Sequence, residues 1–387
     1  MRILYSHRIG SRDGQSLHID ELVAALREVG HEVRVVGPSL YDNMAFGGDS
    51  GGVVLIRKYL PKALNELTEL AYNILAYRRL RRALDSFQPD IIYERYNLFY
   101  LAGTLLARRS GVPLYLEVNS PLADERARYS GLRLQRLAHK LERYIWQSAT
   151  RVLAVTEVLK DTMARAGVAP KRISVTPNGI HLDQFATLKC RSPSADRVAL
   201  GFIGFMREWH GLDRVIDAVA RYDGHPAVRL TIAGEGPARP ALERQVAALG
   251  IQEHVVFTGL ADRATVPTLL ASFDIALQPR VVDYASPLKI FEYMAAGCAI
   301  VAPDQPNIRE VLTDNETALL FDSANPDAMW NAIVRLLADP ELRQRLGEAA
   351  KEAVRQRDYT WDGNARRITT WMQADLGRDT DAAVDAP

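Results

Sequence analysis

The chain repeats one pattern along most of its length: a short apolar run that suits a strand, then a polar loop, then a helical pattern. The first repeat reads ILYS, HRIGSRDGQS and LHIDELVAALREVG, and a second apolar run, HEVRVVG, follows directly. Apolar residues recur at helical spacing between Leu22 and Val29, and Gly30 ends the helix. Because a strand that returns through a helix pairs in parallel with the next strand, this pattern predicts a parallel sheet covered by helices.

The alternation forms two successive series. Strand candidates of the first series continue at 90–94, 113–119, 149–156 and 173–179, and those of the second lie at 198–204, 228–236, 254–260, 273–279 and 298–303. At 387 residues the chain is also too long for one ordinary core. We therefore predict an α/β protein with two Rossmann-like, doubly wound domains that face a cleft, joined by the polar stretch 189–197.

The stretch SPLKIFEYMAAG, residues 286–297, reads as a loop that turns into a helix. Ser286 suits the N-cap, Pro287 suits the first helical position, and Gly297 can end the helix. The unpaired amides and the positive dipole end of such a helix start attract anions. Glu292 lies about 9 Å further along the axis, where it could accept hydrogen bonds from the ribose of a bound nucleotide diphosphate. From this stretch alone, an exposed glutamate on an ordinary helix explains the pattern equally well.

Two loops that follow first strands are candidates for phosphate contacts. GSRDGQS carries Gly10 and Gly14 rather than a tight GxGxxG, which disfavours a dinucleotide cofactor. Gly14 would let the backbone approach a phosphate, or it would only supply a positive φ. GFIGFMREWHGLD places Arg207 and His210 at the carboxyl edge of the second sheet, where ligands bind. Arg207 suits a diphosphate better, because His210 is only partly charged near neutral pH.

The overall charge of +1 hides an asymmetry, since residues 1–185 carry a net charge of +7 and residues 186–387 carry −6. The helix candidate at 73–87 sets four arginines among four large apolar residues: Arg78, Arg79, Arg81 and Arg82, and Leu75, Leu80, Leu84 and Phe87. Packing of this helix on its own domain is the simplest explanation, and docking on anionic lipid is the sharper alternative. No nucleic-acid-binding motif accompanies the arginines, so we expect no nucleic-acid partner.

The remaining composition excludes several classes. Cys190 and Cys298 supply neither a disulfide framework nor metal-ligand spacing, which favours a reducing compartment. The N-terminus lacks the apolar run of a signal peptide, and no stretch is long and apolar enough to cross a bilayer. The only Asp-x-Asp joins Asp379 and Asp381 in the polar tail, so no metal site is predicted. We expect a cytoplasmic protein without metal or other cofactor.

Together these segments resemble the retaining glycosyltransferases of GT-B architecture, in the glycogen-synthase-like branch of family four. The resemblance runs through GHEV, ERYN, EVNSP, TPNGIHLDQF and SPLKIFEYMAAGCAIVAP, and it covers nearly the whole chain. Its most specific part is PLKIFEYMAAG. In that family the glutamate of this helix binds the donor ribose and the amides at the helix start hold the diphosphate, so the resemblance assigns the ribose to Glu292.

The chain departs from the family pattern at several positions. A second family glutamate, eight positions before Glu292, is replaced by Tyr284, with Asp283 beside it. The family's phosphate-binding lysine falls on His210, so that Arg207 would act from a shifted place. Asn119 stands where the family often has a histidine after a strand of the N-terminal domain, and the family's arginine after the strand glycine is here Phe205.

The resemblance implies transfer of a hexose from a UDP- or GDP-sugar to a saccharide or lipid-linked hydroxyl, with retention and without metal. It implies catalytic roles for Arg207, Glu292, Asp283 and Asn119. Donor contacts fall on Gly14, Gln15, Gly204, His210, Glu235, Leu260, Tyr284, Ser286, Pro287, Leu288 and Lys289. Acceptor contacts fall on His7, Arg8, Glu94, Arg95 and Asn97.

The implied N-terminal, acceptor-binding domain spans residues 1–188 and is completed by a closing helix at about 359–376. The implied donor domain spans 189–358, and 377–387 is expected to be a disordered tail. A lipid-linked acceptor would place the protein at the inner face of a membrane. Two alternatives stay open: an epimerase of a UDP-amino sugar, for which Glu94, Glu117 and Asp283 are candidate carboxylates, and a non-catalytic partner subunit, which the departures at Tyr284, His210 and Asn119 would suit.

Overall fold

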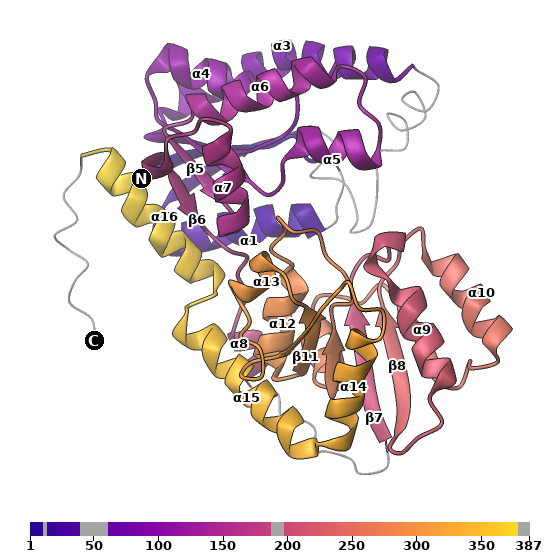
Figure 1. The fold of residues 1–387 in the computed structure, drawn as a ribbon. Coiled ribbons are helices and arrows are strands. Elements are labelled where there is room, and N and C mark those ends of the chain that lie inside the picture. The colour runs from indigo at the N-terminus through magenta and orange to yellow at the C-terminus, as the bar shows by residue number, and fades with distance from the viewer. Residues whose placement is uncertain (11–13, 39–60, 187–196, 378–387) are drawn as a thin grey trace. The chain divides into compact units, whose positions relative to one another are not determined.

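A computed structural model of the chain describes residues 1–10, 14–38, 61–186 and 197–377. The chain divides into two compact units, Met1–Pro177 with Trp361–Pro387, and Asn178–Thr360. Within the described residues, each unit holds one sheet of six parallel strands flanked by helices (Figure 1). The predicted α/β class with two doubly wound domains is confirmed.

The sheet of the first unit has the strand order β2-β1-β3-β4-β5-β6. The strands are β1 (Arg2–Ser6), β2 (Glu32–Val36), β3 (Ile91–Arg95), β4 (Leu114–Val118), β5 (Arg151–Ala154) and β6 (Ile173–Val175). The helices of this unit are α1 (Gly14–Glu28), α3 (Lys62–Phe87), α4 (Ala102–Ser110), α5 (Leu122–Tyr129), α6 (Gln135–Ser148), α7 (Glu157–Arg165) and α16 (Trp361–Asp375). Strand β1 pairs with both β2 and β3, so the order reverses at β1 and β3, and ligands of such sheets bind beyond the carboxyl ends at that point.

The sheet of the second unit has the order β12-β11-β10-β7-β8-β9, and it reverses between β7 and β10. Its strands are β7 (Arg197–Ile203), β8 (Ala227–Ala233), β9 (Val255–Gly259), β10 (Ile275–Leu277), β11 (Ala299–Pro303) and β12 (Leu319–Phe321). Its helices are α8 (Asp183–Ala186), α9 (Leu212–Arg221), α10 (Arg239–Leu249), α11 (Val266–Leu270), α12 (Leu288–Ala296), α13 (Pro306–Arg309), α14 (Ala328–Ala338) and α15 (Pro340–Gln356). Strand β12 was not among the strands predicted from the sequence.

Alternate side chains of the second sheet pack on its two faces, as a doubly wound sheet requires. Ile275 and Leu277 of β10 join one core cluster with α9, α10 and α14, whereas Ala276 between them joins a second cluster with α12 and α15. Both faces are therefore buried, which explains why these strands read as continuous apolar runs in the sequence.

The last helix, α16, belongs to the first unit. Its residue Asp375 accepts hydrogen bonds from Arg151 at 2.8 Å and from the hydroxyl of Tyr115, and Thr369 lies 2.7 Å from the ring of His31. In contrast, residues 178–186 belong to the second unit, because Ile180 pairs with Thr360. The N-terminal segment of the first unit therefore ends at Pro177 rather than at 188. Position 188 lies outside the described residues, as does the tail from 378.

Candidate functional site

Helix α12 is fixed at the reversal point of the second sheet by a buried tyrosine. The hydroxyl of Tyr293 accepts a hydrogen bond from the amide of Ile203 at 3.0 Å and donates one to the carbonyl of Leu277 at 3.3 Å. These two partners end β7 and β10, the strands between which the order reverses. The same helix carries Lys289 and Glu292, which therefore lie on the element that a ligand at this sheet edge would meet.

The N-cap of α12 differs from the sequence prediction by one residue. The helix spans Leu288–Ala296 as predicted and ends at Gly297 with φ of 73°. Its N-cap, however, is Pro287 and not Ser286. The predicted capping role of Ser286 is wrong because its hydroxyl accepts a hydrogen bond from the amide of Asn178 at 3.2 Å, and the Asn178 side chain also donates to the Ser286 carbonyl.

Lys289 lies against the glycine loop that follows β7. A Cβ atom at Gly204, where φ is +136°, would lie 3.0 Å from the Lys289 ammonium, so this close approach needs a glycine. The ammonium also sits 4.0 Å from the centre of the Phe202 ring. Burial lowers the pKa of Lys289 to about 7, against the opposing influence of Glu292. A negatively charged group bound beside the Lys289 ammonium would raise that pKa strongly.

Glu292 follows Lys289 by three residues, so the two side chains lie on one face of α12. Burial raises the pKa of Glu292 to about 7, although Lys289 and the Arg263 guanidinium lower it. A half-buried carboxyl group with a raised pKa on a ligand-facing helix is typical of a binding site rather than of an ordinary surface helix.

Arg207 and His210 occupy the same loop with different surroundings. The exposed Arg207 guanidinium lies 4.9 Å from the Phe205 ring and 4.8 Å from the Trp209 ring. The His210 ring accepts a long hydrogen bond from the Arg207 amide at 3.4 Å. Burial, together with the charges of Lys289 and Arg207, lowers the pKa of His210 to about 3, so His210 is neutral near pH 7. The expectation of a partly charged His210 is therefore wrong, and the cation that contacts this loop is the half-buried Lys289 of α12.

The loop before α12 is held by a residue that sequence reasoning missed. Buried Asn307 donates hydrogen bonds to the carbonyls of Val282 at 3.1 Å and Ala285 at 2.8 Å. These bonds fix the backbone on both sides of the exposed Asp283 and the half-buried Tyr284. No periodicity or spacing in the sequence marks Asn307 for this role.

The remaining donor candidates of the second unit lie at the carboxyl edge of the sheet. The Glu235 carboxylate accepts a hydrogen bond from Arg239, whose Nε donates to Glu243 at 2.7 Å. Leu260 follows β9 and is 54% exposed, and Phe205 follows β7 and is 51% exposed. Both apolar side chains lie at strand ends, where the flat face of a nucleotide base could pack against them.

In the first unit, a buried network occupies the carboxyl ends of β3 and β4. Glu117 accepts hydrogen bonds from Arg95 and from Tyr93 at 2.9 Å, and it pairs with His18 at 2.9 Å. Burial alone would raise the pKa of Glu117, but His18 and Arg95 hold it at about 2. The predicted acceptor residue Arg95 is thus engaged inside the unit.

His7 and Glu94 are also internal. Burial and the nearby Arg95 lower the pKa of His7 to about 4, and its ring accepts a hydrogen bond from the Ile9 amide at 3.2 Å. Glu94 is fully buried, accepts a hydrogen bond from Ser6 at 3.2 Å and faces Gly103 so closely that any side chain there would overlap it. Burial raises the pKa of Glu94 to about 8, so it is mostly protonated at pH 7.

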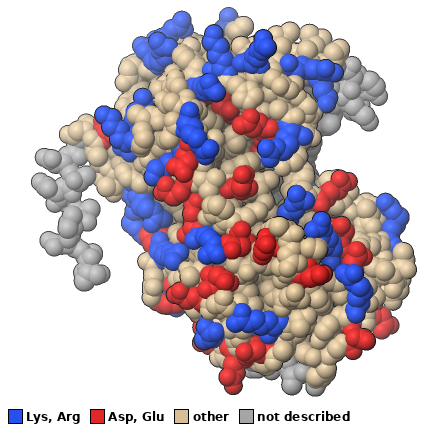
Figure 2. Space-filling view, viewed as in Figure 1, with Lys and Arg blue, Asp and Glu red and all other residues tan. Residues whose placement is uncertain are grey.

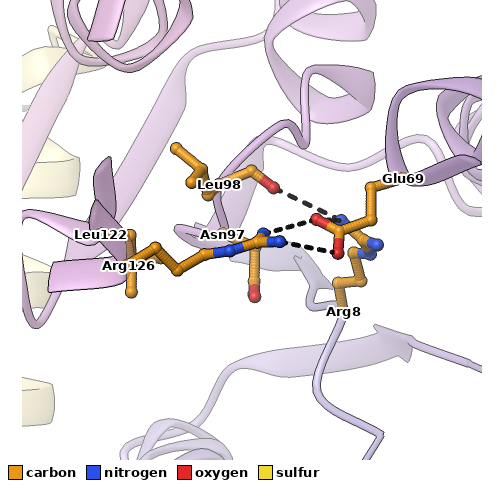
Figure 3. Close-up of a pocket in the computed structure, with 6 residues that line it drawn as sticks. All are labelled: Arg8, Glu69, Asn97, Leu98, Leu122 and Arg126. Carbon is orange, nitrogen blue, oxygen red and sulfur yellow. Dashed lines mark hydrogen bonds and ion pairs between the residues drawn. The ribbon is translucent and has the colours of Figure 1, made fainter. Parts of the chain in front are cut away.

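Arg8 and Asn97 line a pocket of about 210 Å³ in the first unit. Glu69, Leu98, Leu122 and Arg126 complete its lining (Figure 3). Both predicted acceptor residues follow the strands at which the first sheet reverses, whereas Glu69 and Arg126 come from α3 and α5 and were missed. Charged residues on these helices read as solvated positions in the sequence, and only the fold brings them together.

Three predicted site residues remain: Asn119, Gly14 and Gln15. Asn119 follows β4, and its buried amide oxygen has no hydrogen-bond donor among the described residues. Gly14 is the first residue of α1, while the side chain of Gln15 lies outside the described part of the chain, as do Cys190, Asp379 and Asp381.

Within residues 1–10, 14–38, 61–186 and 197–377, no group of three or more His, Cys, Asp or Glu side chains converges as metal ligands do. The predicted independence of metal stays a prediction. No helix in the described ranges has the length and apolar character needed to cross a bilayer.

Comparison with known proteins finds two family models on this chain. The model described as "Glycosyltransferase Family 4" matches residues 12–184, and the model described as "Glycosyl transferases group 1" matches residues 191–353. The two matches follow one another along the chain and together span most of it.

Among curated relatives, the chain is 24% identical over 384 residues to a GDP-mannose-dependent alpha-mannosyltransferase of Mycobacterium tuberculosis, covering 96% of both chains. It is 26% identical over 393 residues to a D-inositol 3-phosphate glycosyltransferase of Jonesia denitrificans, covering 92% of this chain and 90% of that one. Among solved structures, Anabaena Alr3699/HepE in complex with UDP superposes with a TM-score of 0.74 at 18% identity, covering 97% of this chain and 100% of the other.

Proposed function

From its place among the GT-B glycosyltransferases of family four, to which the chain belongs, we propose that it transfers a hexose from a UDP- or GDP-sugar to a hydroxyl group. The acceptor is a saccharide or a lipid-linked saccharide, the anomeric configuration is retained, and no metal takes part. The observation that carries this proposal is the pair Lys289 and Glu292 on α12, fixed beside the glycine loop of β7.

In this proposal the donor diphosphate lies at the start of α12. The first amides of a helix have no partner within it, and the helix dipole favours negative charge there. The Lys289 ammonium adds a positive charge from the same turn, and Arg207 supplies a second one from its exposed position. The ribose hydroxyls donate to Glu292, which lies one turn further along.

The chemical step breaks the bond between the anomeric carbon and the diphosphate oxygen. The acceptor oxygen bonds to the same face of the sugar, and the proton of the acceptor hydroxyl passes to the departing phosphate oxygen. Fixed amides and Lys289 stabilise the charge that develops on the diphosphate, so the reaction needs neither a metal ion nor a strong protein base. Asp283 and Asn119 are proposed to contact the donor sugar and the reacting groups.

The test is incubation of radiolabelled UDP- and GDP-sugars with the protein and an extract of oligosaccharide and lipid acceptors, with and without excess EDTA. We expect label in the acceptor fraction at equal rates in both samples. A donor that changes configuration without transfer would identify an epimerase, and an unchanged donor would identify a non-catalytic subunit. Loss of transfer in EDTA that magnesium or manganese restores would contradict the metal-independent step.

We further propose that the first unit docks on anionic membrane through α3. Leu64, Leu67, Ile74 and Leu75 are large apolar side chains exposed on this helix, and Arg78 and Arg82 continue the same stripe at helical spacing. Figure 2 shows Lys and Arg side chains gathered over α3, α4 and α6. Apolar side chains bordered by arginines match the interface of an anionic bilayer, where each Arg contributes on the order of 1 kcal/mol.

Sedimentation with vesicles tests the docking. Wild-type protein should pellet with anionic but not with neutral vesicles, and binding should fall as salt screens the charges. Changing Arg78, Arg79, Arg81 and Arg82 to Glu should abolish pelleting. A control with the same charge change on exposed positions of the second unit, at Arg214, Arg229, Arg345 and Arg355, should still pellet. Wild-type protein that stays in the supernatant at low salt would contradict the docking and leave the transferase proposal intact.

A further inference from the structure

The pocket of the first unit contains more positive than negative charge. Arg126 donates to both oxygens of Glu69, at 2.7 and 3.3 Å, and Arg8 lies 3.7 Å from the same carboxylate (Figure 3). Two guanidinium groups therefore share one carboxylate among the lining residues. The Arg8 and Glu69 side chains are 13% and 10% exposed and that of Arg126 is 28% exposed, so water compensates this excess charge only in part.

An amide group points to the same conclusion. The Asn97 side-chain nitrogen is buried and has no hydrogen-bond acceptor among the described residues. Its loop is held in place from α3, because Asn73 accepts from the Leu101 amide at 2.6 Å and donates to the Phe99 carbonyl at 2.7 Å. The neighbouring Glu66 is not among the lining residues, and its carboxylate accepts from the amides of Arg133 and Leu134. The pocket thus presents N–H donors in excess over acceptors.

We propose that this pocket binds an anionic group of the acceptor, a phosphate or a carboxylate, between Arg8, Arg126 and the Asn97 amide. The proposal rests on the transferase function above and names the acceptor's chemical class. The pocket volume of about 210 Å³ is below the roughly 300–1,000 Å³ of sites that enclose a whole drug-sized ligand, so it takes one group of the acceptor. Leu98 and Leu122 supply an apolar wall for the adjoining part of the molecule.

Titration with inorganic phosphate at constant ionic strength tests the pocket without knowledge of the acceptor. Arg126→Gln should weaken phosphate binding at least about tenfold, because it removes a charged, two-point donor. Asn97→Ala should weaken it several-fold. Glu69→Gln should keep or tighten binding, because it removes the competing negative charge. Arg128→Gln is the matched control on α5, since Arg128 lies over the Tyr129 ring, and it should bind phosphate as the wild type does.

Phosphate bound at the donor site contributes equally to the titration of every variant. Only differences in phosphate affinity between the variants therefore report on the pocket. Equal phosphate affinity of Arg126→Gln and Arg128→Gln would overturn the proposal, as would a loss in Glu69→Gln as large as in Arg126→Gln. If Arg126→Gln unfolds at a much lower temperature, Arg126→Lys keeps the charge without the two-point geometry and should bind phosphate with intermediate affinity.

Transfer assays then identify the source of the anion. A hexose 6-phosphate, a hexuronic acid and an anionic phospholipid in vesicles are each compared with their neutral counterpart. We expect kcat/KM at least about tenfold higher for one anionic member, and we expect Arg126→Gln to remove that preference through KM. A preference for neutral acceptors would overturn the proposal. Absence of transfer to any acceptor would contradict the transferase function, while the phosphate titration would still decide the pocket.

Discussion

Glu292→Ala is expected to lower kcat/KM for transfer by about 10²- to 10³-fold, because two ribose hydroxyls lose a charged acceptor. The affinity for the matching nucleoside diphosphate, UDP or GDP, should fall with it. Calorimetric titration of both nucleotides and initial-rate measurements of transfer check the two effects separately. Glu348→Ala on α15 is the control, since Glu348 is an exposed helical glutamate of the same unit that accepts a hydrogen bond from Gln344.

The same substitution should not destabilise the protein. The pKa of Glu292 is raised to about 7 in the folded chain, above its ordinary value of 4.5. Between these pH values the folded state binds more protons than the unfolded state, so this group lowers the free energy of unfolding as pH rises towards 7. Removing the carboxyl group removes that penalty, and Glu292→Ala should unfold at the wild-type temperature or above it. Full activity of the variant, or a folding defect that explains its inactivity, would contradict the ribose assignment.

The sequence could predict α12 and its glutamate because the signals are local. The apolar spacing, the proline before the helix and Gly297 after it all lie within one short stretch, and the structure starts and ends the helix where they indicate. The capping residue was mispredicted for a non-local reason. Asn178 is distant from Ser286 in sequence, and only the fold brings its side chain to the serine.

Helix α3 shows a second limit of sequence reasoning. The predicted basic helix at 73–87 is the C-terminal part of a helix that begins at Lys62. In its N-terminal half the usual pattern is reversed, since Glu66 is buried while Leu64 and Leu67 are exposed. A buried carboxylate needs partners from other elements, here two amides at the start of α6, and periodicity carries no information about them.

The predicted acceptor residues fall into two groups, those that line the pocket and those that the fold buries. The family resemblance predicted Arg8 and Asn97, which line the pocket and follow the strands at the reversal point. The same resemblance also selected Glu94 and Arg95, which the fold buries against Gly103 and Glu117. Side chains of successive residues at the end of a strand point to opposite faces of the sheet, and the sequence does not reveal which face stays open to a ligand.

Lys289→Gln is the second substitution for which we expect a large effect, a loss of about 10²-fold in nucleotide affinity and in kcat/KM. Lys289 is the half-buried cation beside the glycine loop, and His210 in that loop is neutral near pH 7. Removing it leaves the diphosphate with the helix amides and the exposed Arg207. Arg207→Gln should cost less, because an exposed cation in water contributes less than a half-buried one.

The pH dependence of nucleotide affinity distinguishes this role from a structural one. Free Lys289 has a pKa of about 7, and a bound diphosphate raises it, so affinity should fall as pH rises above about 7. Free Glu292 also has a pKa of about 7, and the ribose hydroxyls favour its charged form, so affinity should fall as pH drops below about 7. Affinity should therefore be highest near pH 7, and binding on the alkaline side should take up a proton, measurable by calorimetry in buffers of different ionisation enthalpy.

Lys289→Arg tests the alkaline fall in nucleotide affinity independently of the acid fall. A guanidinium stays protonated across the range, so the alkaline fall should disappear while the acid fall remains. In Lys289→Gln the alkaline fall should vanish as well, and the acid fall should move to higher pH, because Lys289 lowers the pKa of Glu292. The ring of His210 cannot produce the alkaline side, since its pKa is lowered to about 3. An alkaline fall that persists in Lys289→Arg would show that another group titrates, and the diphosphate contact of Lys289 would have to be abandoned.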